Sequence, residues 1–129
     1  MDPIADMLTR IRNALMRGQK TTRVPYSKFK KEVATLLAKY GYIRKFETQE
    51  IDQNKKVMKI YLCYKEGKPA ITGLKKISKS GQRIYSGTYN LQRIGGKRGM
   101  IVVSTSKGVL PHWEARKQKA GGEVLCVVY

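Results

Sequence analysis

The sequence predicts an α+β fold built from two small subdomains, an N-terminal α/β part at residues 1–65 and a C-terminal β-rich part at 70–129. Apolar residues recur at helical spacing twice in the first half, whereas the second half holds mainly short strand-like runs. A turn cluster, Glu66-Gly67-Lys68-Pro69, separates the two. A chain of 129 residues with 41% hydrophobic residues can bury a core. We therefore expect α-β-α-β-β followed by a mostly antiparallel sheet with one short helix.

The first helix is expected to begin at Asp2-Pro3, an N-cap acceptor followed by a residue suited to the first turn. Gly18 is expected to end it. Its apolar positions share one face of the cylinder: Ile4, Met7, Leu8, Ile11 and Leu15. The basic and amide side chains fall mostly elsewhere, so one face should pack while the other is basic.

A short strand at 21–24, ended by Pro25, leads to a second helix capped by Ser27 and ended by Gly41. The apolar positions expected on this helix are Phe29, Val33, Leu36, Leu37 and Tyr40. Near its N-terminus stand Lys28, Lys30 and Lys31, the unfavourable charge for that end of the helix dipole. This placement predicts an external anion close by.

The chain then reads as strands and turns. Runs at 42–47 and 57–64 predict a hairpin, and runs at 70–77 and 82–86 predict two strands around a turn at 78–81. Residues 91–94 are predicted to form one helical turn, and the glycine-rich basic run at 95–99 a flexible link.

The last third is organised around an abrupt change from apolar to polar residues. A strand at 100–103 is expected to lead through a loop at 104–108 to a short strand at 109–110 and a helix at 113–119. Gly121-Gly122 should break the chain before a final strand at 123–129. Three hydroxyls, one ammonium and a glycine in the loop suit a surface of phosphate and ribose, although ordinary turns share this composition.

The charge balance points to a polyanionic partner. Against 27 Lys and Arg stand 9 Asp and Glu, a net charge of +18, which is divided as +8 for residues 1–64 and +10 for 65–129. Nucleic acid is the expected partner, because phosphate contacts release condensed counterions. A membrane surface is the rival, but spreading of the charge over both halves disfavours it. No apolar signal core or run of membrane-spanning length appears, so we expect a cytoplasmic protein, with an organellar location as the alternative.

The residues needed for catalysis or metal binding are scattered. His112 is the single histidine, and the two cysteines, Cys63 and Cys126, lie in apolar segments typical of small buried residues. We therefore predict no enzyme activity, no cofactor, no metal and no disulfide. The eight tyrosines exceed the two phenylalanines. Tyr85, near the turn that holds Lys79, is a candidate for stacking on RNA, with packing in a strand as the alternative.

Several motifs in order resemble the eighth-protein family of the small ribosomal subunit, of bacterial or organellar type, over essentially the whole chain. They are Met1 to Ala14, Ile71-Thr72-Gly73-Leu74-Lys75, Ile77-Ser78-Lys79, Gly99, Val102-Val103-Ser104-Thr105, Gly108-Val109-Leu110, Ala115-Arg116 and Gly121 to Cys126.

This resemblance implies a structural constituent of the small ribosomal subunit that binds the central domain of its ribosomal RNA and helps to order it during assembly. The implied main contact is formed by Ser104, Thr105, Ser106, Lys107 and Gly108, with Lys79, Tyr85, Gly121, Gly122 and Glu123 close by. The implied second contact is formed by Asp2, Pro3, Thr9, Arg12, Asn13, Lys28 and Lys31. Neighbouring small-subunit proteins are further implied partners. The alternative is a translational repressor acting on messenger RNA, including its own.

The chain departs from the family pattern at four places. Ser80 replaces a usual proline, Lys97-Arg98 an apolar link, and Tyr129 a common tryptophan. Pro111-His112 occupies the position of a usual Thr-Asp helix cap. Because a Thr or Asp cap contributes about 1 kcal/mol, its loss predicts a late start of the last helix.

Overall fold

The computed structural model describes residues 3–79, 81–86 and 99–129, and it confirms the α+β class. The chain divides into two compact units, an N-terminal unit at residues 6–71 and a C-terminal unit formed by 72–129 with 1–5. The subdomain division at 1–65 and 70–129 stays a prediction. Asp2, Ser80, the predicted helical turn at 91–94 and the link at 95–98 lie outside the described residues.

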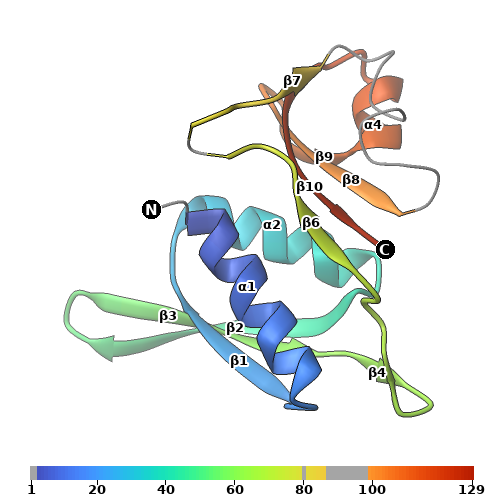
Figure 1. Cartoon of the computed structure of the whole chain (residues 1–129). Coiled ribbons are helices and arrows are strands. Elements are labelled where there is room, and N and C mark those ends of the chain that lie inside the picture. The colour runs from blue at the N-terminus through green and yellow to red at the C-terminus, as the bar shows by residue number, and fades with distance from the viewer. Residues whose placement is uncertain (1–2, 80, 87–98) are drawn as a thin grey trace. The chain divides into compact units, whose positions relative to one another are not determined.

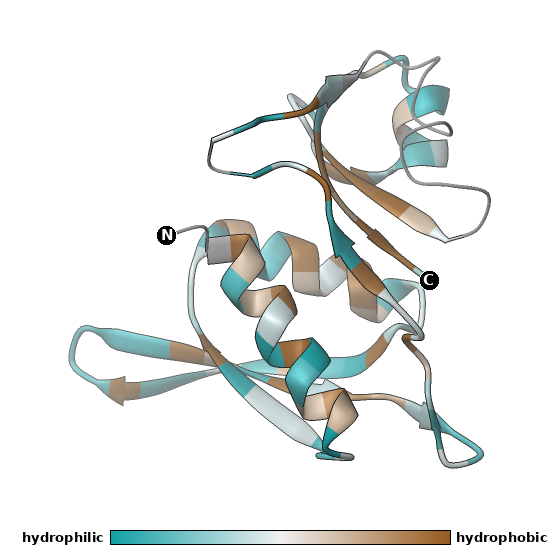
Figure 2. Ribbon diagram, viewed as in Figure 1, coloured by the Kyte–Doolittle hydropathy of each residue, from teal (hydrophilic) through white to brown (hydrophobic). Residues whose placement is uncertain are grey.

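Both predicted helices of the N-terminal unit are present, as α1 (Pro3–Met16) and α2 (Lys28–Lys39). Met7, Leu8 and Ile11 are buried on α1, as the helical spacing predicts. The alternation of apolar and polar colour along both helices in Figure 2 shows this amphipathic pattern. The Oγ of Ser27 accepts a hydrogen bond from the backbone N–H of Lys30 at 3.1 Å and caps α2.

The helices lie against one face of an antiparallel sheet with strand order β1-β3-β2 (Figure 1). Its strands are β1 (Thr21–Pro25), β2 (Ile43–Asp52) and β3 (Lys55–Leu62). The predicted hairpin is confirmed but longer, and its far end extends past the helices in Figure 1. Along β3, Met58, Ile60 and Leu62 are buried, whereas Val57, Lys59 and Tyr61 are half-buried. One sheet face is therefore covered and the opposite one open.

Two small strands, β4 (Tyr64–Lys65) and β5 (Lys68–Pro69), close the N-terminal unit as a hairpin. Tyr64 was predicted to continue β3, but it starts this separate hairpin. Its hydroxyl donates to the backbone carbonyl of Gln19. The turn between β4 and β5 places Glu66 and Gly67 at positive φ, 53° and 78°.

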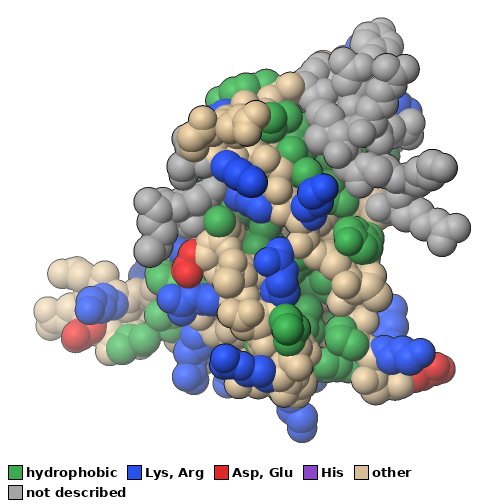
Figure 3. All heavy atoms as spheres, in the orientation of Figure 1, with side chains coloured by type: hydrophobic (Ala, Val, Ile, Leu, Met, Phe, Trp, Pro, Cys, Tyr) green, Lys and Arg blue, Asp and Glu red, His purple; other side chains and the backbone are tan. Residues whose placement is uncertain are grey.

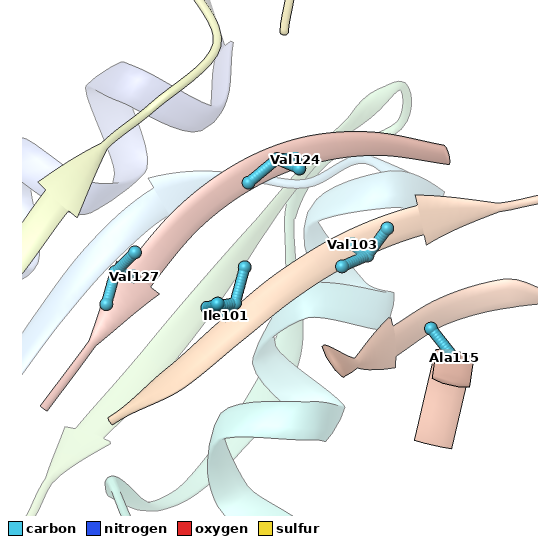
Figure 4. Close-up of a cluster of buried hydrophobic side chains, with 5 residues drawn as sticks. All are labelled: Ile101, Val103, Ala115, Val124 and Val127. Atoms are coloured by element: carbon cyan, nitrogen blue, oxygen red, sulfur yellow. The ribbon is translucent and has the colours of Figure 1, made fainter. Parts of the chain in front are cut away.

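The C-terminal unit is built on a second antiparallel sheet in which β10 (Gly122–Val128) is central. The order along the main path is β6-β10-β8-β9, and β7 also pairs with β10. The other strands are β6 (Leu74–Lys76), β7 (Tyr85–Ser86), β8 (Met100–Thr105) and β9 (Gly108–Pro111). Side chains of β8 and β10 pack with Ala115 of helix α4 (His112–Lys117) in the core of Figure 4: Ile101, Val103, Val124 and Val127.

Two strand predictions are corrected in length. The run at 70–77 forms only the three residues of β6, and the run at 82–86 forms only the two of β7. Before β6, the backbone N–H groups of Thr72 and Gly73 donate to the carbonyl oxygen of Tyr129 at 2.7 and 2.9 Å. Before β7, the buried hydroxyl of Ser78 bonds both backbone groups of Ile84. These hydrogen bonds satisfy the backbone groups of Thr72, Gly73 and Ile84, although no strand ladder continues through those residues.

The predicted late start of the last helix is wrong. Helix α4 begins at His112 directly after Pro111, which has extended angles of −72° and 156° and makes no side-chain cap. The backbone N–H of Ile101 in β8 donates to Nδ1 of His112 at 3.1 Å. This hydrogen bond ties the first residue of α4 to β8.

Candidate nucleic-acid interface

Residues 104–108 form the end of a tight hairpin, in which Thr105 of β8 pairs with Gly108 of β9 and Ser106 and Lys107 make the turn. The Thr105 hydroxyl donates to the carbonyl oxygen of Gly108 at 2.8 Å and accepts from the N–H of Lys107 at 3.1 Å. Gly108 has a φ of 110°, which favours glycine. The predicted loop at 104–108 is corrected in length: β8 continues through Thr105 and β9 starts at Gly108, so only Ser106 and Lys107 form the turn, and Thr105 fixes it.

The tip of this hairpin is exposed and basic. Ser106 and Lys107 are exposed, and the Nζ of Lys107 donates to the carbonyl oxygen of Gln118 at 3.3 Å, at the C-terminal end of α4. An ammonium held in this way keeps further N–H groups for another acceptor, because lysine has three donors. Arg116 and Lys117 in the last turn of α4 are exposed and add positive charge.

The first residues of β10 bring three distant segments together. Glu123 pairs with Ser104 of β8 on one side and with Tyr85 of β7 on the other. Directly paired residues share a sheet face, so Tyr85, Glu123 and Ser104 form one row. Tyr85 is 69% exposed, and its role in stacking on RNA stays a prediction. Glu123 was predicted in a turn, but Gly122 and Glu123 both belong to the strand.

Gly122 is required where it stands, because β10 and β8 approach closely. A Cβ atom at this position would lie 2.1 Å from the carbonyl oxygen of Ser104 and 2.9 Å from its carbonyl carbon. Neither backbone atom can move without breaking the pairing of β10 with β8. The glycine therefore sets the strand spacing beneath the Tyr85, Glu123 and Ser104 row.

Charges around this row are only partly balanced. The Arg83 guanidinium pairs with the Glu123 carboxylate at 3.1 Å, so the predicted acidic site residue is partly neutralised. Lys79, a further predicted contact, is exposed but lies in the turn in which its backbone bonds Gln82, outside the β7-β10-β8 pairing. Gly121 is exposed just before β10.

The described residues of the second predicted group lie on α1 and α2. Thr9, Arg12 and Asn13 are exposed on α1, and Lys28 and Lys31 are exposed in the first turn of α2. Pro3 is the first residue of α1, whereas Asp2 lies outside the described residues. On the side seen in Figure 3, Lys and Arg side chains far outnumber Asp and Glu.

Lys30 does not join this group, which corrects the expectation of three lysines awaiting an anion. The residue is only 5% exposed. Burial lowers the pKa of Lys30, the nearby Asp6 carboxylate opposes that shift, and Arg10 adds to it. Part of the charge placed against the α2 dipole is therefore met by an internal carboxylate.

Three residues near the main candidate interface were not predicted from the sequence: Ser78, Arg83 and Gln118. Each acts through a partner distant in sequence, namely Ile84, Glu123 and Lys107. Of the three, only Ser78 had a signal in the sequence, because it stands in the motif Ile77-Ser78-Lys79 that carries the family resemblance.

Within the parts of the chain that the structure describes, no three His, Cys, Asp or Glu residues gather as a metal site would require. The same described residues hold no helix long and apolar enough to span a membrane.

Comparison with known proteins gives the family of this chain. Residues 2–129 match the family described as Ribosomal protein S8. The chain belongs to this ribosomal protein family. It is 47% identical over 129 residues to small ribosomal subunit protein uS8 of Clostridioides difficile (strain 630), covering 99% of this chain and 97% of the relative. The same-named proteins of Shouchella clausii (strain KSM-K16) and Caldicellulosiruptor bescii are 49% and 47% identical, covering 99% and 100% of this chain and 97% and 98% of theirs.

Membership of the S8 family confirms the predicted resemblance and the predicted class of protein. The chain is a structural protein of the small ribosomal subunit, and it is not an enzyme. The scattered carboxylates and the single histidine agree with this assignment.

Proposed function

We propose that this chain binds the central domain of small-subunit ribosomal RNA and orders it during assembly, with the 104–108 hairpin as its main contact. The observation that carries the proposal is the hairpin itself, whose Thr105 hydroxyl is bonded to both Gly108 and Lys107 before any RNA arrives. A turn fixed in advance loses little conformational freedom on binding.

Different groups of the hairpin have different roles in this proposal. Ser104 and Ser106 offer hydroxyls to ribose and base edges, and Lys107 offers its remaining ammonium protons to a phosphate. Thr105 and Gly108 hold the turn. Tyr85 presents an exposed ring on the same sheet face as Ser104, suited to stacking on an unpaired base.

The exposed side chains of α1 and α2 form a second contact in this proposal. Arg12, Lys28 and Lys31 supply charge for the phosphate backbone, and Thr9 and Asn13 supply hydrogen-bonding groups. The protein would act in the cytoplasm as part of the ribosome, beside other small-subunit proteins. A messenger RNA with the same bulged element would bind the same hairpin.

Filter-binding titrations at fixed, near-physiological salt test the main contact. A bulged hairpin from the central domain is compared with a length-matched duplex without the bulge, and we expect a preference of at least about a hundredfold. Lys107→Ala should lower the log-log salt slope for the bulged hairpin by about one unit. Lys68→Ala is the matched control, because Lys68 is exposed on the separate β4-β5 hairpin.

Equal binding of the two RNAs would contradict the proposal, since the net charge alone would then explain the affinity. Co-sedimentation with small subunits after a high-salt wash separates a resident ribosomal role from a free regulator of messenger RNA. A protein found only in the free fraction would overturn the assembly role.

A further inference from the structure

The open face of the β1-β3-β2 sheet carries a row of positive charges that the proposed interface does not use. The register places Arg23, Lys59 and Glu47 opposite one another, and Thr21, Tyr61 and Lys45 in the next row. These residues alternate with the buried Met58 and Ile60, so their side chains lie on the uncovered side. Lys55 continues the charge along β3 opposite Asp52.

Tyr61 organises the centre of this face. The Nζ atoms of Lys45 and Lys59 lie 4.7 and 5.1 Å from the centroid of its ring. Both distances are within the range of cation–π attraction. The ring therefore attracts both ammonium groups to the centre of this face.

A carboxylate already contacts the tyrosine and one of the two lysines. The Tyr61 hydroxyl donates to Oε2 of Glu47 at 3.1 Å, and the Nζ of Lys45 lies 3.3 Å from Oε1. The hydrogen bond from Tyr61, together with Lys45, lowers the pKa of the Glu47 carboxyl, so the group is ionised at neutral pH. The arrangement thus already pairs with a singly charged oxygen anion, the same charge that one phosphodiester group carries.

We propose that the open face of the β1-β3-β2 sheet binds the phosphate backbone of a single-stranded RNA segment through Arg23, Lys45 and Lys59. Tyr61 is the positioning residue that holds the two lysines, and Glu47 is the internal anion that a phosphate displaces.

Charge complementarity favours RNA as the occupant. Four cations and two carboxylates lie on this face, and Glu47 is already paired with Lys45. An RNA strand carries one negative charge per nucleotide, and phosphate contacts gain affinity by counterion release. A strand of the sheet repeats side chains on one face about every 6.6 Å, which suits an extended backbone.

The test uses the full chain and a fluorescent 12-nucleotide oligouridylate as probe. Replacing both lysines, Lys45→Gln with Lys59→Gln, should lower the affinity about tenfold and the log-log salt slope by about 1.4. The matched control replaces two exposed lysines of the β4-β5 hairpin, Lys65→Gln with Lys68→Gln, with the same loss of charge. We expect this control to change the affinity less than twofold.

Glu47→Gln should change the affinity in the opposite direction. A gain in affinity cannot result from a failure to fold, so this variant keeps the proposal testable. The exposed amide removes the internal anion, so oligouridylate should bind about threefold more tightly. Tyr61→Leu should lower the affinity, whereas Tyr61→Phe, which keeps the ring, should retain most of it. Circular dichroism melts check that each variant is folded.

Two results would overturn the proposal. One is an equal loss of affinity in the control pair, which would mean that net charge alone binds the probe. The other is an oligoglutamate of matched charge that binds as tightly as oligouridylate and shows the same variant pattern, which would assign the face to an acidic protein segment. Binding of the bulged hairpin should be unchanged in the Lys45 and Lys59 variant, so the two interfaces are tested separately.

Discussion

The 104–108 hairpin and the open face of the β1-β3-β2 sheet both offer groups to an anion, but they hold those groups in different ways. In the hairpin, Thr105 is bonded to backbone atoms of Gly108 and Lys107, so the turn has one shape. On the sheet, Tyr61 holds two lysine side chains by its ring. The first arrangement favours recognition of RNA shape, and the second favours recognition of charge.

The largest expected effect comes from Gly122→Ala. The added Cβ would clash with the backbone of Ser104, so we expect a loss of about 3 kcal/mol in the free energy of unfolding and loss of bulged-hairpin binding. Chemical denaturation measures the first and filter binding the second.

Gly81→Ala is the control for this change, because a Cβ there meets nothing within 4 Å. If the 104–108 hairpin and the open sheet face bind RNA independently, Gly122→Ala should weaken binding of the bulged hairpin far more than binding of oligouridylate. An equal loss for both RNAs would show that the two surfaces are not independent.

Thr105→Ala and Ser104→Ala separate shape from direct contact within the hairpin. Each should weaken binding of the bulged hairpin by about 1 to 3 kcal/mol and leave the salt slope nearly unchanged. Only Thr105→Ala should also lower the free energy of unfolding, by about 1 kcal/mol, because its hydroxyl bonds the backbone. Equal stability of the two variants would contradict the positioning role of Thr105.

Ser27→Ala tests whether a hydrogen bond from the backbone to a side-chain hydroxyl also stabilises the N-terminal unit, as we expect for Thr105 in the hairpin. Its hydroxyl caps α2, so we expect a loss of about 1 kcal/mol in the free energy of unfolding. Thr35→Ala, an exposed change in the same helix, is the control. Urea denaturation distinguishes them, and an unchanged midpoint for Ser27→Ala would show that the cap contributes nothing.

The smallest effect is expected from the pH dependence of His112. Burial, with a contribution from Arg116, lowers the pKa of this imidazole in the folded chain. As the pH falls below about 6.5, the unfolded chain binds more protons than the folded one, so the free energy of unfolding should decrease. His112→Gln should flatten this part of the stability curve, and a curve identical to that of the parent would contradict the role of His112.

Local patterns predicted most of the elements of the fold. Helical spacing and Ser27 located α1 and α2, and the apolar run before Ser104 located β8. The extents of β6 and β7 were not predictable, because the residues that precede these strands bond instead to Tyr129 and to the Ser78 hydroxyl. The start of α4 depends likewise on a bond from Ile101.

The candidate surfaces were predictable to different degrees. The hairpin residues are contiguous, so their composition and the family resemblance identified them together. Lys30 was wrongly expected to await an external anion. The residue is buried near Asp6, which lies on the other helix, and the sequence pattern of one helix does not show such a contact. The charges of the open sheet face alternate with core residues on three strands, and only the register of β1, β3 and β2 brings them into rows.

The two cysteines give the molecule one natural chemical reporter in each unit. Cys126 is fully buried in β10, and burial raises the pKa of its thiol to about 12, so little reactive thiolate exists while the strand is paired. Cys63 is half-buried between β3 and β4 in the other unit. Alkylation of Cys126 therefore requires opening of the central strand of its sheet. The two labelling rates would time the opening of each half without any engineered probe and show whether they open together.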